Sequence, residues 1–283
     1  MLNRRIGISF LVGLLLICVV YSFALVQAPT TAPADRPGPA NTGPHGSLKP
    51  SNSILAMQPG QVISDVDIAG TIQIKAANVI IRNFRLNAND APYAIRVFAD
   101  ASVTLEDGEI TKAAEAAVYG NDWTCRRLNI HHMGADGLKG GGNNRLEDCW
   151  IHHLGMTKGA HADGVQIDNG SHFVFRHNNF DLPWWDELPV PGQTQKQVFR
   201  ANSVFFINGW VGDIDDVVIE NNWLNGGNYT IYALKQTNTH VHNNRMGRDA
   251  QYGLLNGKNV DWGDNVWEDT GKSAGAYEKI TSR

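Results

Sequence analysis

The sequence predicts an all-β solenoid in which short parallel strands stack into about ten coils. Three observations support this fold class. Two columns of aliphatic residues recur along the chain, with most gaps near 18 to 24 residues. Turn-forming Asn, Gly and Asp separate the apolar segments. After the N-terminal segment, no stretch of useful length has the 3.6-residue period of a helix. A unit of two or three short strands cannot bury its apolar side alone, so equivalent units must stack on one another.

The composition excludes several other classes of protein. The chain has 283 residues, a net charge of −4 and 18% charged residues, below the roughly 25% typical of soluble domains. It lacks the basic excess of a nucleic-acid-binding protein, and we expect no nucleic-acid partner. Its 42% hydrophobic content and eight Trp exclude a disordered chain.

The first segment, residues 1–28, is predicted to be an export signal or an N-terminal membrane anchor. Arg4 and Arg5 precede an uncharged apolar run over residues 6–26, long enough to span a bilayer if it is not cleaved. The rest of the chain is therefore expected outside the cytoplasm: secreted, periplasmic or anchored at the cell surface. We expect membrane contact only through this segment.

The second segment, residues 29–53, is rich in Pro, Thr, Gly and Ala and is predicted to be an extended linker. Residues 54–283 remain as one domain, expected to be a monomer. Cys125 and Cys149 lie in neighbouring coils but three residues out of step. That offset is too large for a disulfide bond, so we predict two buried thiols.

The first repeat column consists of the apolar residues that close successive segments: Ile68, Leu86, Ile110, Ile130, Ile151, Phe180, Leu224, Met246 and Trp267. Three positions before each of them stand Asp65, Asn83, Asp107, Arg127, Asp148, His177, Asn221, Asn243 and Asp264. Most of these polar side chains can share hydrogen bonds along a stack. We expect them to form the corners of the coils, where Asn tolerates left-handed backbone.

The second column consists of Ile72, Ile95, Val118, Leu138, Val165, Val204, Ile231 and Leu254. Because side chains alternate along a strand, the residue after each of these is predicted to point outward. That outward stripe is Gln73, Arg96, Tyr119, Lys139, Gln166, Phe205, Tyr232 and Leu255. Its basic, amide and aromatic centre is what a sugar-binding face needs. The alternative is an ordinary sheet surface, since Tyr and Phe are good strand formers.

These periodic columns and the polar ladder, from about residue 54 to 270, resemble the right-handed parallel β-helix proteins of the pectate-lyase-like superfamily. The resemblance implies right-handed coils, in line with the general preference of parallel crossovers. The superfamily includes lyases, hydrolases, epimerases and non-catalytic adhesins, so the resemblance implies no single activity.

The sharpest local feature is a pair of aspartates, Asp136 and Asp163, at equivalent places in successive coils. Two carboxylates one strand spacing apart raise one pKa, share a proton or bind a cation such as Ca²⁺. The sequence establishes no cofactor, and Ca²⁺ at Asp136 and Asp163 is a candidate. Lys139, His161 and Gln166 lie beside the pair. The alternative is that each Asp-Gly forms a turn and accepts local backbone hydrogen bonds.

Two further features flank these coils. Two histidine pairs occupy identical repeat positions, His131-His132 and His152-His153. Four stacked imidazoles can bind a transition metal, but a structural ladder or a groove wall is favoured. In the groove wall, His132 and His153 are expected to line the substrate path. Insertions at 155–160 and about 181–200 interrupt the repeat. In the second, Trp184 and Trp185 are expected either to pack on the coils or to stack on a ligand.

The leading functional hypothesis is a lyase that cleaves an acidic polysaccharide by β-elimination. Arg96, or a cation held by the aspartates, neutralises the uronate. Lys139 or His161 abstracts the C5 proton, and Tyr119 or Tyr232 protonates the leaving oxygen. A lysine base requires a lowered pKa.

Three alternatives remain open. C5-epimerisation uses nearly the same parts, and the aspartate pair can support glycoside hydrolysis. The third is a non-catalytic carbohydrate-binding or surface protein, in which the Trp and Tyr side chains matter and the charged ones do not.

Overall fold

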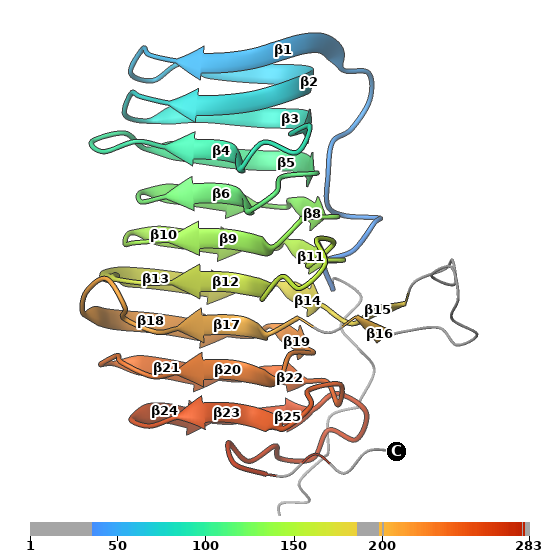
Figure 1. Cartoon of the computed structure of the whole chain (residues 1–283), viewed down its shortest axis with the longest axis vertical. Coiled ribbons are helices and arrows are strands. Elements are labelled where there is room, and N and C mark those ends of the chain that lie inside the picture. Colours follow the sequence, from blue (N-terminus) through green and yellow to red (C-terminus); the bar gives the residue numbers. More distant parts are fainter. Residues whose placement is uncertain (1–35, 186–197, 200, 279, 281–283) are drawn as a thin grey trace, which may run out of the picture. The chain divides into compact units, whose positions relative to one another are not determined.

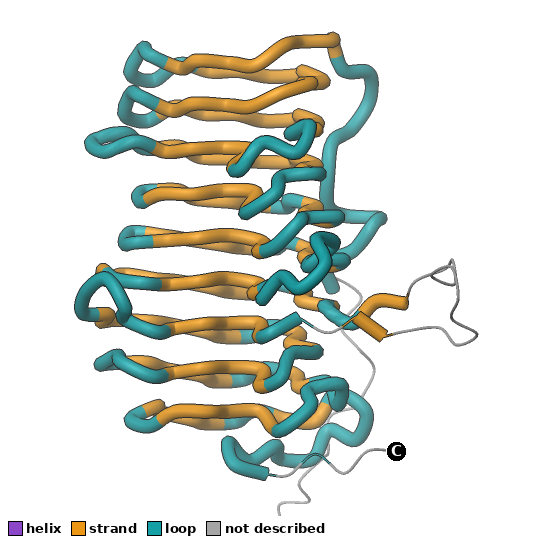
Figure 2. The backbone as a smooth tube through the Cα atoms, viewed as in Figure 1, coloured by secondary structure: helices purple, strands orange, loops and turns teal. Residues whose placement is uncertain are grey.

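The computed structural model describes residues 36–185, 198–199, 201–278 and 280. They belong to one compact unit, Ala32–Arg283, in which strands wind repeatedly around a common core (Figure 1). The secondary structure of this described part consists of strands joined by turns and loops (Figure 2), and it contains no helix long and apolar enough to cross a membrane. The predicted signal or anchor, residues 1–28, lies outside the described residues.

Three parallel sheets form the faces of the coil. The first sheet contains β4 (Tyr93–Val97), β6 (Ala116–Gly120), β9 (Asp136–Gly140), β12 (Asp163–Ile167), β17 (Ser203–Ile207), β20 (Tyr229–Ala233) and β23 (Gly253–Gly257). The second contains β7 (Trp123–Arg126), β10 (Asn144–Glu147), β13 (Gly170–Arg176), β18 (Ile214–Glu220), β21 (Thr239–His242) and β24 (Val260–Gly263). The third contains β8 (Asn129–His131), β11 (Trp150–His152), β14 (Asn179–Asp181), β19 (Trp223–Asn225), β22 (Arg245–Met246) and β25 (Val266–Trp267).

The N-terminal coils are built from longer strands that bend around the corners and join the three sheets: β1 (Lys49–Ala56), β2 (Val62–Ile74), β3 (Val79–Asn87) and β5 (Val103–Thr111). Along the first sheet, β1, β2, β4, β6, β9, β12, β17, β20 and β23 make nine described levels, close to the predicted number of coils. The short antiparallel pair β15 (Trp184–Trp185) and β16 (Val198–Phe199) stands apart from this ladder.

The aliphatic columns fill the core as predicted, except that the register is shifted by one residue in two coils. Val165 lies opposite Phe205, and Phe205 lies opposite Ile231. Phe205 is therefore an inward residue, fully buried, and the prediction that it faces outward is wrong. The outward residue of β17 is Phe206. The error arose because Val204 and Phe205 are both buried, so the apolar pattern alone does not locate the inward position. The same one-residue shift applies to the last coil, where Leu255 is buried.

The predicted corner column is confirmed. All nine residues have φ between 50° and 59°, in the left-handed region that Asn and Asp tolerate best among the non-glycine residues. Some corner side chains bond directly across coils: Asn83 Nδ2 donates to Asp65 Oδ1 at 2.7 Å, and Arg127 Nε donates to Asp107 Oδ1 at 2.6 Å.

A continuous buried ladder stands one residue later than the predicted one: Asn178, Asn222, Asn244 and Asn265. In this Asn ladder each amide oxygen accepts the backbone N–H of the preceding member, and each amide nitrogen donates to a backbone carbonyl at 2.7–2.9 Å. Cys149 occupies the equivalent place one coil earlier, where its thiol accepts the N–H of Leu128 at 3.3 Å. Cys125 and Cys149 are free and buried, as predicted, and burial raises the pKa of Cys149 to about 12.

On the outer surface of the second sheet, basic and acidic side chains alternate from coil to coil. The ladder register aligns Arg82, Glu106, Arg126, Glu147, Arg176 and Glu220. Arg126 pairs with Glu147 at 3.0 Å, and Arg176 pairs with Glu220 at 3.1 Å. In this charge ladder, each charged side chain therefore lies opposite a side chain of opposite charge on a neighbouring coil.

The predicted linker boundary is wrong within its described part. The first strand begins at Lys49 rather than at residue 54, and residues 36–48 run beside the coils (Figure 1). Arg36 pairs with Glu268 at 2.6 Å, and the Gly43 N–H donates to the Arg127 carbonyl at 2.9 Å. An extended segment rich in Pro and Gly has no periodic apolar pattern, so its packing against the coils could not be predicted from the sequence.

Candidate functional site

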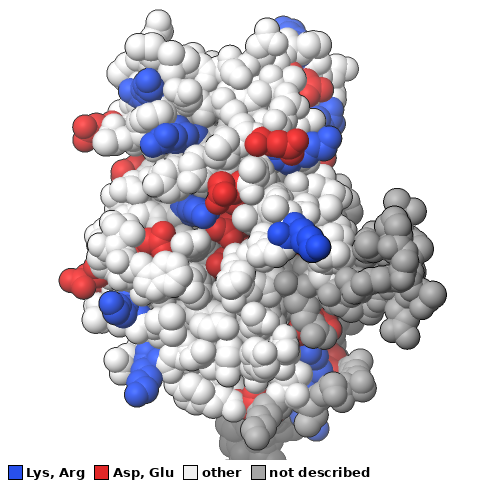
Figure 3. Space-filling view, in the orientation of Figure 1, with Lys and Arg blue, Asp and Glu red and all other residues white. Residues whose placement is uncertain are grey.

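The outward stripe of the first sheet is the candidate site. The strand register places Arg96 opposite Tyr119, Tyr119 opposite Lys139, and Lys139 opposite Gln166. Figure 3, which looks onto this face, shows acidic and basic atoms adjoining near its middle, among mostly uncharged residues. At the carboxyl ends of these strands lies a cleft of about 720 Å³, lined among others by Arg96, Phe98, Tyr119, Lys139, Asp168 and Asn169.

Arg96 supplies an exposed positive charge in this cleft. Its guanidinium carbon lies 4.7 Å from the centre of the Phe98 ring and 5.8 Å from that of Tyr119. No described carboxylate lies within ion-pair distance of it. A cation held between aromatic faces, without an acidic partner among the described residues, is arranged to receive an anionic ligand.

Lys139 is held by two carboxylates. Its Nζ lies 3.0 Å from Oδ2 of Asp136 and 3.6 Å from Oε2 of Glu115. Burial acts to lower the pKa of Lys139, but the charges of Asp136 and Glu115 raise it, and the net change is upward. Lys139 is therefore protonated at neutral pH. The lowered pKa that a lysine base requires is absent, so the predicted role in proton abstraction does not fit.

Asp136 and Asp163 begin β9 and β12 and connect successive coils. Oδ1 of Asp136 accepts the backbone N–H of Asp163 at 2.8 Å. Oδ1 of Asp163 accepts the Ser203 hydroxyl at 2.5 Å and the Asn202 amide at 3.0 Å. The two residues lie in strands rather than in turns, and the backbone N–H that Asp136 accepts comes from the next coil, so the alternative of local turn hydrogen bonds is wrong.

The pKa values of both carboxyl groups are raised. Burial is the main cause in each case; for Asp163 the charge of Asp136 adds to it, and the pKa reaches about 8. The surroundings do not fit calcium, which takes six to eight oxygen ligands. Asp136 already holds the Lys139 ammonium, and the groups at Asp163 Oδ1 are hydrogen-bond donors. We derive no step through Ca²⁺.

The remaining predicted residues of this face are Tyr119, Gln166, Tyr232 and His161. The ring of Tyr119 stacks on Tyr93 at 4.4 Å, and Gln166 donates to Asp168 at 2.9 Å. Burial raises the pKa of Tyr232, with smaller contributions from Tyr229 and Asp163. His161 is exposed, two residues before Asp163.

The histidines form the predicted ladder. His131 stacks on His152 at 4.9 Å, and His132 stacks on His153 at 5.0 Å. Burial, followed by the neighbouring imidazoles, lowers the pKa of His152 to about 2, so its ring is neutral. His152 Nε2 lies 3.0 Å from Asn129 Oδ1. His132 and His153 do not line the 720 Å³ cleft, and the contacts of the ladder favour a structural role.

Of the predicted tryptophan pair, Trp184 packs on the coils. It is buried, its indole N–H donates to the Leu154 carbonyl at 2.8 Å, and its ring stacks on Phe199 at 4.1 Å. Of the two predicted alternatives, packing on the coils is the one that these contacts support. The side chain of Trp185 lies outside the described residues.

Trp210 is an aromatic residue of this face that the repeat pattern does not single out. This indole is 69% exposed and packs edge to face against Phe206 at 5.3 Å, while Phe206 packs against Tyr232 at 5.4 Å. Its neighbour Val211 lines the cleft. Trp210 stands in a turn outside both repeat columns, and a Trp beside Gly209 in a surface turn was the only available signal.

Comparison with known proteins identifies the fold family. A family described as "Right handed beta helix region" matches residues 114–266, more than half of the chain. No curated protein and no solved structure matches the chain. The matched region spans the coils from β6 to β25, including Lys139 and both aspartates. The chain therefore belongs to the right-handed β-helix family.

Proposed function

We propose that this protein is an extracytoplasmic enzyme that binds a uronate-containing polysaccharide on the first sheet and cleaves it by β-elimination. The observation that carries the proposal is the position of Arg96: a cation without a described carboxylate partner, between aromatic rings, in a cleft of about 720 Å³. The apolar run after Arg4 and Arg5 supports export.

Tyr119 and Lys139, which line the cleft together with Arg96, suit the steps of this reaction. A uronate carboxylate paired with Arg96 makes the sugar C5 proton more acidic. A base then takes that proton, a C4–C5 double bond forms and the C4–oxygen bond breaks. His161 and Tyr119 are the candidate bases, and the protonated Lys139 donates to the leaving oxygen. C5-epimerisation shares the first step but returns the proton to the opposite face of the ring.

Glycoside hydrolysis is the second candidate, favoured by one specific observation. The pKa of Asp163, about 8, keeps this carboxyl protonated at neutral pH beside a second carboxyl group. A protonated carboxyl next to an ionised one is the arrangement of a general acid and its partner. Asp163 is only 2% exposed, so this role requires the substrate to displace the residues that cover it.

The test is a panel of uronate polysaccharides incubated with the protein lacking residues 1–28. Rising ultraviolet absorbance from unsaturated products, lost in Arg96→Ala and Lys139→Ala, supports the lyase. The matched control is Arg82→Ala on the second sheet, which is expected to retain activity. His161→Ala and Tyr119→Phe separate the two candidate bases.

Each other outcome points to a different function. New reducing ends without absorbance, lost in Asp163→Ala, indicate hydrolysis and overturn the lyase. Proton exchange at C5 without cleavage indicates an epimerase. Binding without any product, weakened in Trp210→Ala, indicates a non-catalytic carbohydrate-binding protein.

A further inference from the structure

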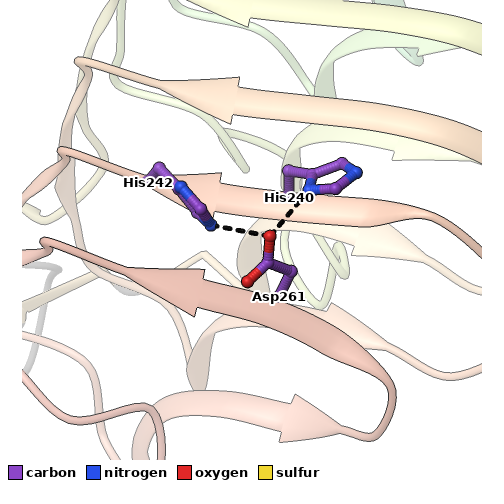
Figure 4. A group of neighbouring side chains, drawn as sticks. All are labelled: His240, His242 and Asp261. Atoms are coloured by element: carbon purple, nitrogen blue, oxygen red, sulfur yellow. Dashed lines mark hydrogen bonds and ion pairs between the residues drawn. The ribbon is translucent and has the colours of Figure 1, made fainter.

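A cluster of two histidines and one aspartate lies on the second sheet, near the C-terminal end of the coil (Figure 4). His240 and His242 belong to β21, and Asp261 belongs to β24, the next strand of the ladder. Oδ2 of Asp261 lies 2.9 Å from Nδ1 of His240 and 3.1 Å from Nε2 of His242. One ligand atom from each residue lies within 4.8 Å of the other two.

The strand geometry brings these side chains together. Residues two apart on a strand point to the same face, so His240 and His242 both face outward while Val241 is buried in the core. The register sets Asp261 opposite His240 and Gly263 opposite His242. A Cβ at Gly263 would lie 3.3 Å from Cε1 of His242, so the glycine leaves room for the imidazole ring.

One nitrogen of the cluster is buried without a hydrogen bond. Nε2 of His242 is covered, and although Asp261 lies 3.1 Å away, no described group satisfies it with hydrogen-bond geometry. Its contact with Asp261 is an ion pair without hydrogen-bond geometry, and a metal ion between the two is a partner that an imidazole nitrogen accepts.

We propose that His240, His242 and Asp261 bind a divalent first-row transition ion, with Zn²⁺ as the reference case. Zinc binds imidazole nitrogen and carboxylate oxygen at about 2.0–2.2 Å, so the ligand atoms around one ion lie about 3–3.5 Å apart. The separations of 2.9 and 3.1 Å are close to that range. Ca²⁺ and Mg²⁺ prefer all-oxygen sites and fit poorly.

The site is accessible from solvent. The side chains of Asp261 and His240 are 58% and 45% exposed, and both line a hollow of about 410 Å³ beside the turn at Gln236–Asn238. Asp261 can turn to admit the ion, and the remaining coordination position stays open to water or an external ligand. Because the ligands come from β21 and β24, the ion joins the last two coils.

Isothermal titration calorimetry of the intact protein with ZnCl₂ tests the proposal, with CaCl₂ as the comparison ion. The wild type is expected to bind Zn²⁺ at one such site. His240→Ala, His242→Ala and Asp261→Asn are each expected to weaken binding at least tenfold. His172→Ala is the matched control, because His172 pairs with Asp216 at 2.7 Å on the same sheet but does not belong to a three-ligand group among the described residues.

Two outcomes overturn the proposal: no Zn²⁺ binding by the wild type, or equal affinity in the three variants and the wild type. In the second case the ion binds elsewhere, and His132→Ala with His153→Ala would locate it at the histidine ladder. Urea unfolding of each metal-free variant shows that the loss is not a folding defect. The Co²⁺ absorption spectrum of the wild type reports nitrogen and oxygen ligation independently of affinity.

Discussion

Lys139 and Asp136 form an ion pair within one strand, three residues apart, with Nζ and Oδ2 separated by 3.0 Å. The side chain of Lys139 is 18% exposed and that of Asp136 only 3%. The pair therefore lies largely out of water at the centre of the outward stripe. Because each charge is costly to bury alone, the lysine and the aspartate depend on one another.

Replacing Lys139 by Ala leaves the buried Asp136 without its cation. We expect the free energy of unfolding at pH 8 to fall by about 3 kcal/mol. The loss should shrink at lower pH, where Asp136 takes up a proton. Urea unfolding at pH 5 and pH 8 measures both values. The double variant Lys139→Met with Asp136→Asn removes both charges and should recover stability; a Lys139→Ala protein as stable as the wild type at pH 8 would contradict the expectation.

Replacing Asp163 by Asn should change how stability depends on pH. The native carboxyl, with a pKa near 8, keeps a proton that the unfolded carboxyl loses at its ordinary value of 3.8. The free energy of unfolding therefore falls as pH rises from about 4 to 8, by up to about 1.4 kcal/mol per pH unit from this group. Asn resembles the protonated form and lacks this slope. Thermal unfolding from pH 4 to 8 compares the two proteins, and parallel curves would rule out the proposed titration.

The histidine ladder should make the protein sensitive to acid. The native pKa of His152 is about 2, so the unfolded chain takes up a proton below its ordinary value of 6.5 and the native ring does not. This group alone should lower the free energy of unfolding by about 2 kcal/mol between pH 7 and pH 5. His152→Gln is expected to lose less stability over that interval, by urea unfolding. The exposed His172→Gln is the comparison variant.

The Asn ladder should depend on its central amide. Asn222 accepts the N–H of Asn178 at 2.8 Å and donates to the carbonyl of Phe175 at 2.9 Å. Asn222→Ala leaves both backbone groups buried without partners, at a cost of about 2–4 kcal/mol. Asn221→Gly, one residue earlier at a φ of 58°, is expected to change stability little. Chemical unfolding of both variants decides whether the buried ladder or the corner residue carries the stability.

Trp210 is expected to contribute to ligand binding rather than to folding. If a polysaccharide lies along Phe206 and Tyr232, Trp210→Ala should raise the Kd of an acidic oligosaccharide about tenfold, or about 1.4 kcal/mol. Trp210→Phe keeps a ring and should lose less. The melting temperature should stay within a degree or two, because the indole is 69% exposed. An unchanged Kd with a lower melting temperature would assign Trp210 to packing.

The repeating part of this structure was largely predictable from sequence. Val118, Leu138 and Val165 define their column because equivalent residues in stacked coils must occupy the same position. The corner residues follow for a similar reason, since left-handed backbone selects Asn and Asp. The register failed at Phe205, where two adjacent buried residues satisfy the apolar pattern equally well.

The candidate site was harder to predict because it depends on features that do not repeat. The cleft is lined partly by turn residues such as Phe98, Asp168 and Asn169, whose positions depend on loop lengths. The protonation of Lys139 depends on its distances from Asp136 and Glu115, which no spacing in the sequence encodes. The sequence correctly places Lys139 on the outward stripe. Its protonation state follows only from the three-dimensional structure, because it depends on the neighbouring carboxylates.

The charge ladder of the second sheet influences which strands pair with one another. Aliphatic columns are nearly identical from coil to coil, so a strand that skipped one coil would still bury its side chains. On the charge ladder, such a slip would set Arg82 against Arg126, or Glu106 against Glu147, in place of opposite charges. Like charges directly opposite are destabilising. The alternation of charge therefore favours pairing with the strand of the adjacent coil over pairing with the strand one coil further along.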